Sequence, residues 1–233
     1  MDVGGGLQDF NYTTDAPGSY AQVVYKQPKK YFLLGRFDYL DKFADKTFTP
    51  TLGGGYYVLP RLILQDQIAF SPGAQVVPQF SNLFEISGIL PKGFAPYLRY
   101  GYRHYSIADL NLITPGLAWY AGDWGVFEFN YTLSVNDLTT LGSTELDNSF
   151  MFRITLIPIM DRLKFRVLYA RTEESFDAGS PVNPLGSFHA NHVGGGFEWA
   201  FLKNLGVRFD FDYENRDNGQ TVHTYDSGIF FLF

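Results

Sequence analysis

The chain has 233 residues, and its 18 Lys and Arg against 24 Asp and Glu give a formal net charge of −6. This balance argues against nucleic acid as a partner, because phosphate binding needs a basic surface. Cysteine is absent, which excludes disulfide scaffolds, thiol catalysis and cysteine-ligated metals. Aromatic residues reach 18%, yet the mean hydropathy is only −0.10. That combination fits a sheet with one apolar face and one wet face.

Nothing in the sequence resembles a membrane-spanning helix, which needs about 20 mostly apolar residues. The longest unbroken apolar runs are five residues, at 117–121 and 229–233. The start, MDVGGG, lacks the basic and apolar regions of a secretory signal. We therefore expect that a signal peptide has been removed and that Met1 was added for expression.

The sequence alternates between apolar and polar residues at period two almost throughout, which predicts strands with two different faces. Near the C-terminus, for example, the apolar set is Val207, Phe209, Phe211 and Tyr213, and the polar set is Arg208, Asp210, Asp212 and Glu214. Turn residues separate the alternating segments. In chain order, the predicted strands lie near 7–14, 19–26, 31–40, 46–58, 62–70, 79–90, 95–105, 109–120, 125–134, 148–157, 163–172, 188–201, 206–214 and 221–233.

The connections between these strands fall into two classes. Most odd-numbered connections are longer and acidic, whereas the even-numbered ones are short and often basic. A transmembrane β-barrel separates its connections in this way, with short turns in the periplasm and longer loops outside. We therefore predict an all-β fold, a closed antiparallel transmembrane barrel of about 14 strands, with 12 as the alternative. An even strand count places both termini in the periplasm. The barrel is expected to cover 7–233, after a flexible tail at 1–6.

The barrel must be closed, because every backbone amide in hydrocarbon needs a partner within the protein. The charged face then turns inward. The predicted lumen-lining residues are Arg36, Asp38, Glu85, Arg99, Arg103, Glu128, Arg153, Lys164, Arg166, Glu198, Arg208, Asp210, Asp212 and Glu214. Their placement is uneven, since the seventh, tenth and eleventh predicted strands are basic and the thirteenth is acidic, so opposed walls of unlike charge would create a field across a lumen. The alternative is that these ions pair and fill the interior as a polar core.

A second candidate site is the pair His104 and Ser106 at the outer end of the seventh predicted strand. Side chains two apart on a strand share a face, which gives a base and a nucleophile the right reach. By this register the pair faces lipid, and it resembles the His-x-Ser pairs of the outer-membrane phospholipase and lipid A deacylase. Asp109 or Asn111 is a candidate for the group that orients the imidazole. The alternative is an interfacial His beside a loop Ser.

The remaining motifs carry no chemistry that we would assign. His189 and His192 point to opposite faces of a strand, which is poor geometry for one metal ion. The triplets 53–55 and 194–196 lack the helix and the Lys-Ser/Thr of a phosphate loop, so we expect these glycines to relieve bending beneath a neighbouring ring. No metal and no cofactor is predicted.

Two features link the chain to known outer-membrane proteins. In the last strand, Tyr225, Ile229, Phe231 and Phe233 share one face, which resembles the C-terminal signal that the barrel-assembly machinery recognises. The segment 99–134 resembles the YaiO-like family of outer-membrane β-barrels through its Tyr/Arg-rich strand at 100–105, Asp109, the run 114–117 and Tyr120. The resemblance implies an outer-membrane barrel, with related barrels found in exopolysaccharide export, and supplies no catalytic residues.

Together these observations predict a barrel of the bacterial outer membrane that forms a narrow, porin-like channel for small polar or saccharide solutes. One alternative is a plugged accessory barrel of an envelope or exopolysaccharide-export system. The other is an outer-leaflet lipid hydrolase that uses His104 and Ser106. The expected partners are outer-membrane lipid and lipopolysaccharide, the assembly machinery through Phe233, and a further envelope-complex protein.

Overall fold

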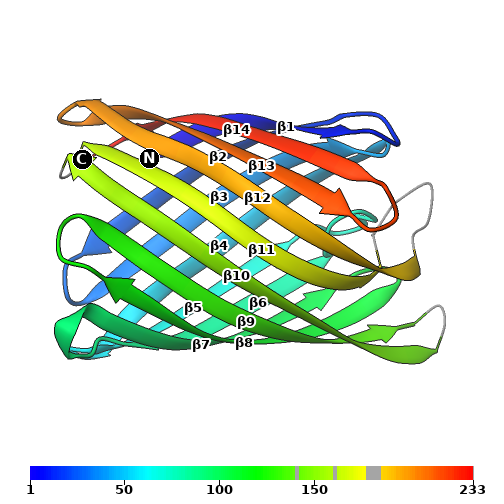
Figure 1. Cartoon of the computed structure of the whole chain (residues 1–233), viewed down its shortest axis with the longest axis horizontal. Helices are drawn as coiled ribbons and strands as arrows, with labels where there is room; N and C mark the ends of the chain where they lie inside the picture. Colours follow the sequence, from blue (N-terminus) through cyan, green and yellow to red (C-terminus); the bar gives the residue numbers. More distant parts are fainter. Residues whose placement is uncertain (140–141, 160–161, 177–184, 233) are drawn as a thin grey trace.

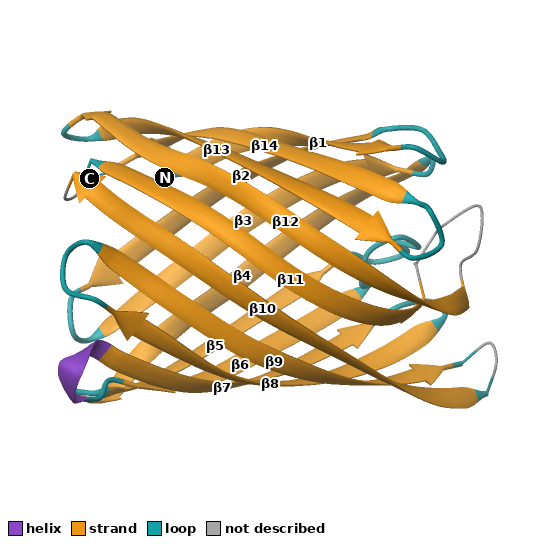
Figure 2. Cartoon of the chain, viewed as in Figure 1, coloured by secondary structure: helices purple, strands orange, loops and turns teal. Residues whose placement is uncertain are grey.

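The chain forms a closed barrel of fourteen antiparallel strands (Figures 1 and 2). The computed structural model describes residues 1–139, 142–159, 162–176 and 185–232. Helix in these residues is limited to one 3₁₀ turn, η1 (Pro91–Gly93), so none of their helices could span a bilayer. The strands are β1 (Asp2–Phe10), β2 (Ala16–Gln27), β3 (Tyr31–Lys42), β4 (Asp45–Leu59), β5 (Leu62–Phe70), β6 (Phe80–Gly88), β7 (Phe94–His104), β8 (Ala108–Tyr120), β9 (Gly125–Leu138), β10 (Ser143–Ile159), β11 (Leu163–Phe176), β12 (Leu185–Leu202), β13 (Leu205–Arg216) and β14 (Thr221–Phe231).

The barrel closes where β1 pairs with β14, from Asp2 opposite Phe230 to Phe10 opposite Val222. Fourteen strands are therefore confirmed, and the alternative of twelve is wrong. Closure leaves no open edge whose amides would meet lipid.

The first strand begins earlier than predicted. Residues 2–6, expected to be a flexible tail, form the first part of β1 and pair with both β2 and β14. The prediction was wrong because Gly4, Gly5 and Gly6 have no side chains and so carry no alternating pattern. Their backbone amides still pair, and that pairing closes the barrel.

The two faces of the sheet differ as the alternation predicts. Many outward-facing apolar side chains are well exposed, such as Phe209 at 38% and Leu52 at 72%, and they form the surface that faces lipid. Asp210 lies between Phe209 and Phe211 and points the other way, where it binds Arg166 inside the barrel. The apolar exterior and the charged interior are those of a transmembrane β-barrel.

The short turns and both chain termini lie at one end of the barrel, on the left in Figure 1, and the odd-numbered connections lie at the other. Several strands extend beyond their predicted ends. β10, predicted as 148–157, has 17 residues, because polar residues at its loop end still alternate and still pair with β9. The predicted connection 41–46 is reduced to Phe43 and Ala44, both with positive φ (54° and 62°), as a two-residue hairpin of type I′ requires.

Candidate functional site: the barrel interior

The interior contains open space rather than a packed core. A cavity of about 640 Å³ extends along the wall from β3 to β10. Two smaller cavities of about 340 and 270 Å³ lie against β1–β4 with β14, and against β10–β14. Arg36, Arg153 and Asp226 each line two of the three cavities. The hollow therefore runs around the whole inner wall.

All fourteen residues proposed to line the lumen lie on the concave face. Residues that pair directly across antiparallel strands share a face. Glu85 pairs with Arg99, and Glu128 with Arg153, so each pair projects inward together. In the same way Lys164 pairs with Glu198, which pairs in turn with Arg208. The members that line the largest cavity are Arg36, Arg99, Arg103, Glu128 and Arg153.

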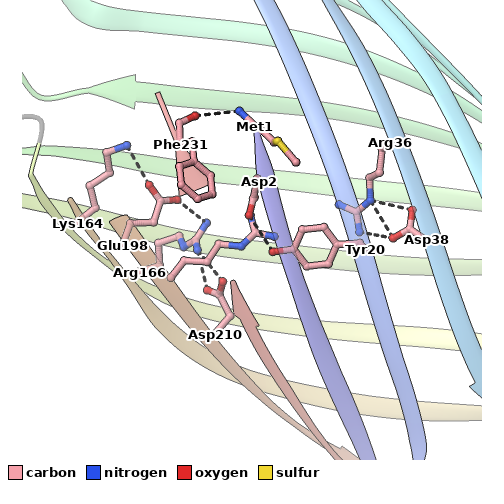
Figure 3. A network of polar contacts seen from close by, with 11 residues as sticks. Met1, Asp2, Tyr20, Arg36, Asp38, Lys164, Arg166, Glu198, Asp210 and Phe231 are labelled. Atoms are coloured by element: carbon pink, nitrogen blue, oxygen red, sulfur yellow. Dashed lines mark hydrogen bonds and ion pairs between the residues drawn. The ribbon is translucent and has the colours of Figure 1, made fainter. Parts of the chain in front are cut away.

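The interior ions pair along the wall. Arg99 lies 2.7 Å from Glu85 on the neighbouring strand, and Lys164 lies 3.1 Å from Glu198. Arg153 pairs with Glu128. Arg166 reaches farther, from β11 across β12 to Asp210 on β13, at 2.7 Å (Figure 3). Each of these four cations is thus held by a carboxylate on the adjacent strand or the next but one.

A second group of contacts bridges the closure of the barrel. Tyr20 on β2 donates a hydrogen bond to Asp2 on β1 at 3.1 Å (Figure 3). Arg208 on β13 binds Asp2 at 2.8 Å. The guanidinium groups of Arg36 and Arg208 lie 4.8 and 4.7 Å from the centre of the Tyr20 ring, within cation–π range. Arg36 in turn binds Asp38. These five residues tie β13, β1, β2 and β3 together.

Sequence reasoning missed Asp2 and Tyr20. Asp2 fell in the expected tail, and Tyr20 was one of many tyrosines. The alternation of Val3 and Leu7 with polar or small neighbours would have extended the strand to Asp2. The contact of Tyr20 with two arginines depends on closure of the barrel and has no local signal.

Glycines on the concave face make room for the side chains that cross strands. A Cβ at Gly196 would lie 2.1 Å from Asp210 Oδ1 and 2.5 Å from the Phe209 carbonyl oxygen. A Cβ at Gly4 or Gly228 would lie 2.4 or 2.3 Å from the Tyr20 hydroxyl. These three inward positions, on β12, β1 and β14, therefore favour glycine.

The expected covering of glycine by a ring occurs in part. Rings cover Gly55, where a Cβ would meet Phe32 at 2.3 Å, and Gly116, where it would meet Tyr97 at 2.2 Å. In β12, by contrast, a carboxylate covers Gly196.

Arg103 differs from the other inward cations. It is exposed on the wall of the largest cavity, and within the described residues it has no ion-pair or hydrogen-bond partner. Its neighbours across the sheet are Ser81 and Leu110, neither of which is a carboxylate. Arg103 thus presents a full positive charge to the interior water.

The inward acids nearest the loop end have their own partners. Asp212 lies 3.2 Å from Nδ1 of His192. Glu214 binds Arg216. Together with the pairs described above, they complete the contacts of the predicted lumen-lining set.

The His104–Ser106 candidate lies on the outer face at the loop end. His104 Nδ1 lies 2.7 Å from Asp109 Oδ1, which also accepts a hydrogen bond from the Tyr102 hydroxyl at 2.8 Å. Of the two candidate orienting groups, Asp109 is in place, whereas Asn111 binds Tyr100. Ser106 lies in the loop, and no hydrogen bond joins it to His104. The imidazole is thus paired with a carboxylate, and Ser106 is not part of this hydrogen-bonded group.

Comparison with known proteins identifies the fold. No family profile and no curated protein sequence matches the chain, so the YaiO-like resemblance is not confirmed. Among solved structures, the NanC porin matches over 100% of this chain and 99% of its own, with a TM-score of 0.57 and 11% identity. The monoaromatic hydrocarbon channel CymD matches over 100% and 88%, with a TM-score of 0.61 and 10% identity. A bacterial polysaccharide outer membrane secretin matches over 100% and 97%, with a TM-score of 0.62 and 8% identity. The chain therefore has the fold of outer-membrane β-barrel proteins.

Proposed function

We propose that this protein is a channel of the bacterial outer membrane that passes small polar solutes, including saccharides, through a charge-lined lumen. The observation that carries the proposal is the cavity of about 640 Å³, where Arg36, Arg99 and the pair Glu128–Arg153 are held against the wall by ion pairs. A barrel of eight strands is filled by its side chains, and one of sixteen to eighteen encloses a channel. A barrel of fourteen strands lies between these cases, so the placement of its inward side chains decides whether the lumen is filled or open.

The ion pairs argue against a plugged interior. A polar plug needs side chains from opposite walls to meet across the axis. The longest of the bridges described above, from Arg166 to Asp210 and from Arg208 to Asp2, each pass over a single intervening strand. Ion pairs of this kind stay along the wall and leave the central axis of the barrel open to water. The shared fold with NanC and CymD, which are a porin and a channel, supports the same function.

Single-channel recording in planar bilayers tests the proposal. We expect steady current through the purified barrel. Because the chain has no cysteine, one introduced cysteine provides a unique site of attack. A charged methanethiosulfonate reagent should reduce the current through Thr132→Cys, which lines the largest cavity, and should leave Ile113→Cys, which is 46% exposed on the outer face, unchanged.

Two outcomes count against a channel. Absence of current at every voltage would support the plugged accessory barrel instead. Equal sensitivity of the two cysteine variants would show that the current does not pass through the lumen. The hydrolase alternative has a separate test, which is release of fatty acid from phospholipid or lipid A and its loss in Ser106→Ala.

A further inference from the structure

The six short turns at one end of the barrel form a basic rim. Five of them contribute Lys29, Lys30, Arg61, Lys92, Arg162 and Lys203. All six side chains are exposed, and none of them forms an ion pair with another residue that the structure describes. The turns also contain Asp123, and the sequence adds Asp161, outside the described residues.

The opposite end has the reverse character. The connections there contain no lysine or arginine, and they include Asp15, Asp177 and Asp217. Among the connections between strands, lysine and arginine thus occur at one end of the barrel only. Neither the lumen nor the proposed channel accounts for this placement.

The same rim carries all three tryptophans of the chain. Trp119 on β8 and Trp199 on β12 are 39% and 51% exposed on the outer face, and Trp124 lies in the turn between β8 and β9 at 54%. The Trp119 indole donates a hydrogen bond to the backbone carbonyl of Lys92 at 3.2 Å. Tryptophan prefers the level of the lipid headgroups, where its ring is in hydrocarbon and its N–H reaches polar groups.

Further outward aromatic pairs border the basic turns. Tyr25 and Tyr31, with ring centres 6.2 Å apart, stand on the two strands that the Lys29–Lys30 turn joins. Trp199 and Phe201, 5.8 Å apart, precede Lys203. Exposed cations therefore lie next to the rings that fix the depth of the barrel in the membrane, at headgroup level.

We propose that the basic rim binds anionic phospholipid headgroups and so selects the lipids around the turn end of the barrel. The cations come from five turns distributed around the circumference, and they border the lipid-facing aromatics. This distribution matches a ring of lipids, whereas a soluble acidic partner would be expected to meet a patch on one side. A lysine or arginine near an anionic membrane surface strengthens binding by roughly fivefold.

Quenching of tryptophan fluorescence by brominated lipids tests this directly, because all three tryptophans report on this rim. The barrel is refolded into mixtures of phosphatidylglycerol and phosphatidylcholine in which either lipid alone carries bromine. The two quenching curves give the binding of phosphatidylglycerol relative to phosphatidylcholine. We expect a ratio well above one, which falls as salt is added because the attraction is electrostatic.

A matched pair of variants assigns the preference to the rim. Lys92→Gln with Lys203→Gln removes two cations beside Trp119 and Trp199, and should lower the ratio by about fivefold or more. Lys46→Gln with Arg171→Gln removes two charges near the loop end and should leave it unchanged. A ratio of one in the native protein, or an equal fall in both variants, would overturn the proposal. A ratio of one would also favour a soluble acidic partner for the rim. Neither result bears on conductance, so the test is independent of the channel.

Discussion

In two regions of the inner wall, the same residue types have different roles. Around the closure, from β11 through β14 and β1 to β3, arginines and carboxylates make contacts that cross strands (Figure 3). Glycines lie beneath these side chains. On the opposite wall, Arg99 pairs with Glu85 on the next strand, and Arg103 has no partner among the residues that the structure describes. The first region holds the barrel together, and the second presents charge to the cavity. The comparison shows that the surroundings of an arginine, rather than its presence, decide whether it is structural.

Gly196→Ala should have the largest effect on stability, because it places a methyl group against Asp210 and against the backbone of β13. Overpacking against backbone that cannot move costs about 3 kcal/mol. Guanidinium unfolding of the barrel refolded in phospholipid vesicles should show a clear loss. The control is Gly35→Ala, where a Cβ meets nothing within 4 Å and stability should stay within about 0.5 kcal/mol. Equal behaviour of the two variants would refute the packing role of Gly196.

Arg166→Gln should have the next largest effect on stability, because it leaves Asp210 and Glu198 without the cation that they share. Removing one partner of a buried pair costs 3–5 kcal/mol, and partial exposure to interior water reduces this to about 1–3 kcal/mol. The same unfolding measurement applies. If the bridge is responsible, Arg166→Gln combined with Asp210→Asn should recover part of the loss, and strict additivity would contradict it.

Tyr20→Leu should cost about 1–2 kcal/mol, since it removes two cation–π contacts and the hydrogen bond to Asp2 while keeping apolar bulk. Tyr20→Phe retains the ring and should lose only about 1 kcal/mol. Unfolding midpoints separate the two variants. A larger loss in Tyr20→Phe than in Tyr20→Leu would mean that the arginines do not depend on the ring.

Arg103→Gln should leave stability within about 0.5 kcal/mol, because the side chain has no partner to lose. It should instead lower the permeability of anions relative to cations, measured as the reversal potential in a salt gradient across a planar bilayer. Arg103→Lys keeps the charge and should keep the reversal potential. A stability loss as large as that of Arg166→Gln would remove the distinction between the two walls.

The candidate hydrolase site shows where local patterns stop being informative. His104 and Ser106 are two apart, which on a continuous strand would place them side by side. The strand ends at His104, so Ser106 follows the loop and makes no bond to the imidazole, whereas Asp109 does. Spacing predicts a shared face only while the strand continues.

The sequence by itself determined the barrel fold, the orientation of the two faces and the identity of the inward charges, and left the strand number between 14 and 12, because a period-two pattern is local and repeats in every strand. It also placed the basic residues in the short turns. Tertiary structure alone decided that residues 2–6 complete the wall and that Asp2 and Tyr20 join its two ends. It also decided which arginine binds which carboxylate. These features depend on strand register and on barrel closure, which bring together residues as distant in sequence as Asp2 and Arg208. The sequence around either residue contains no signal for such a contact.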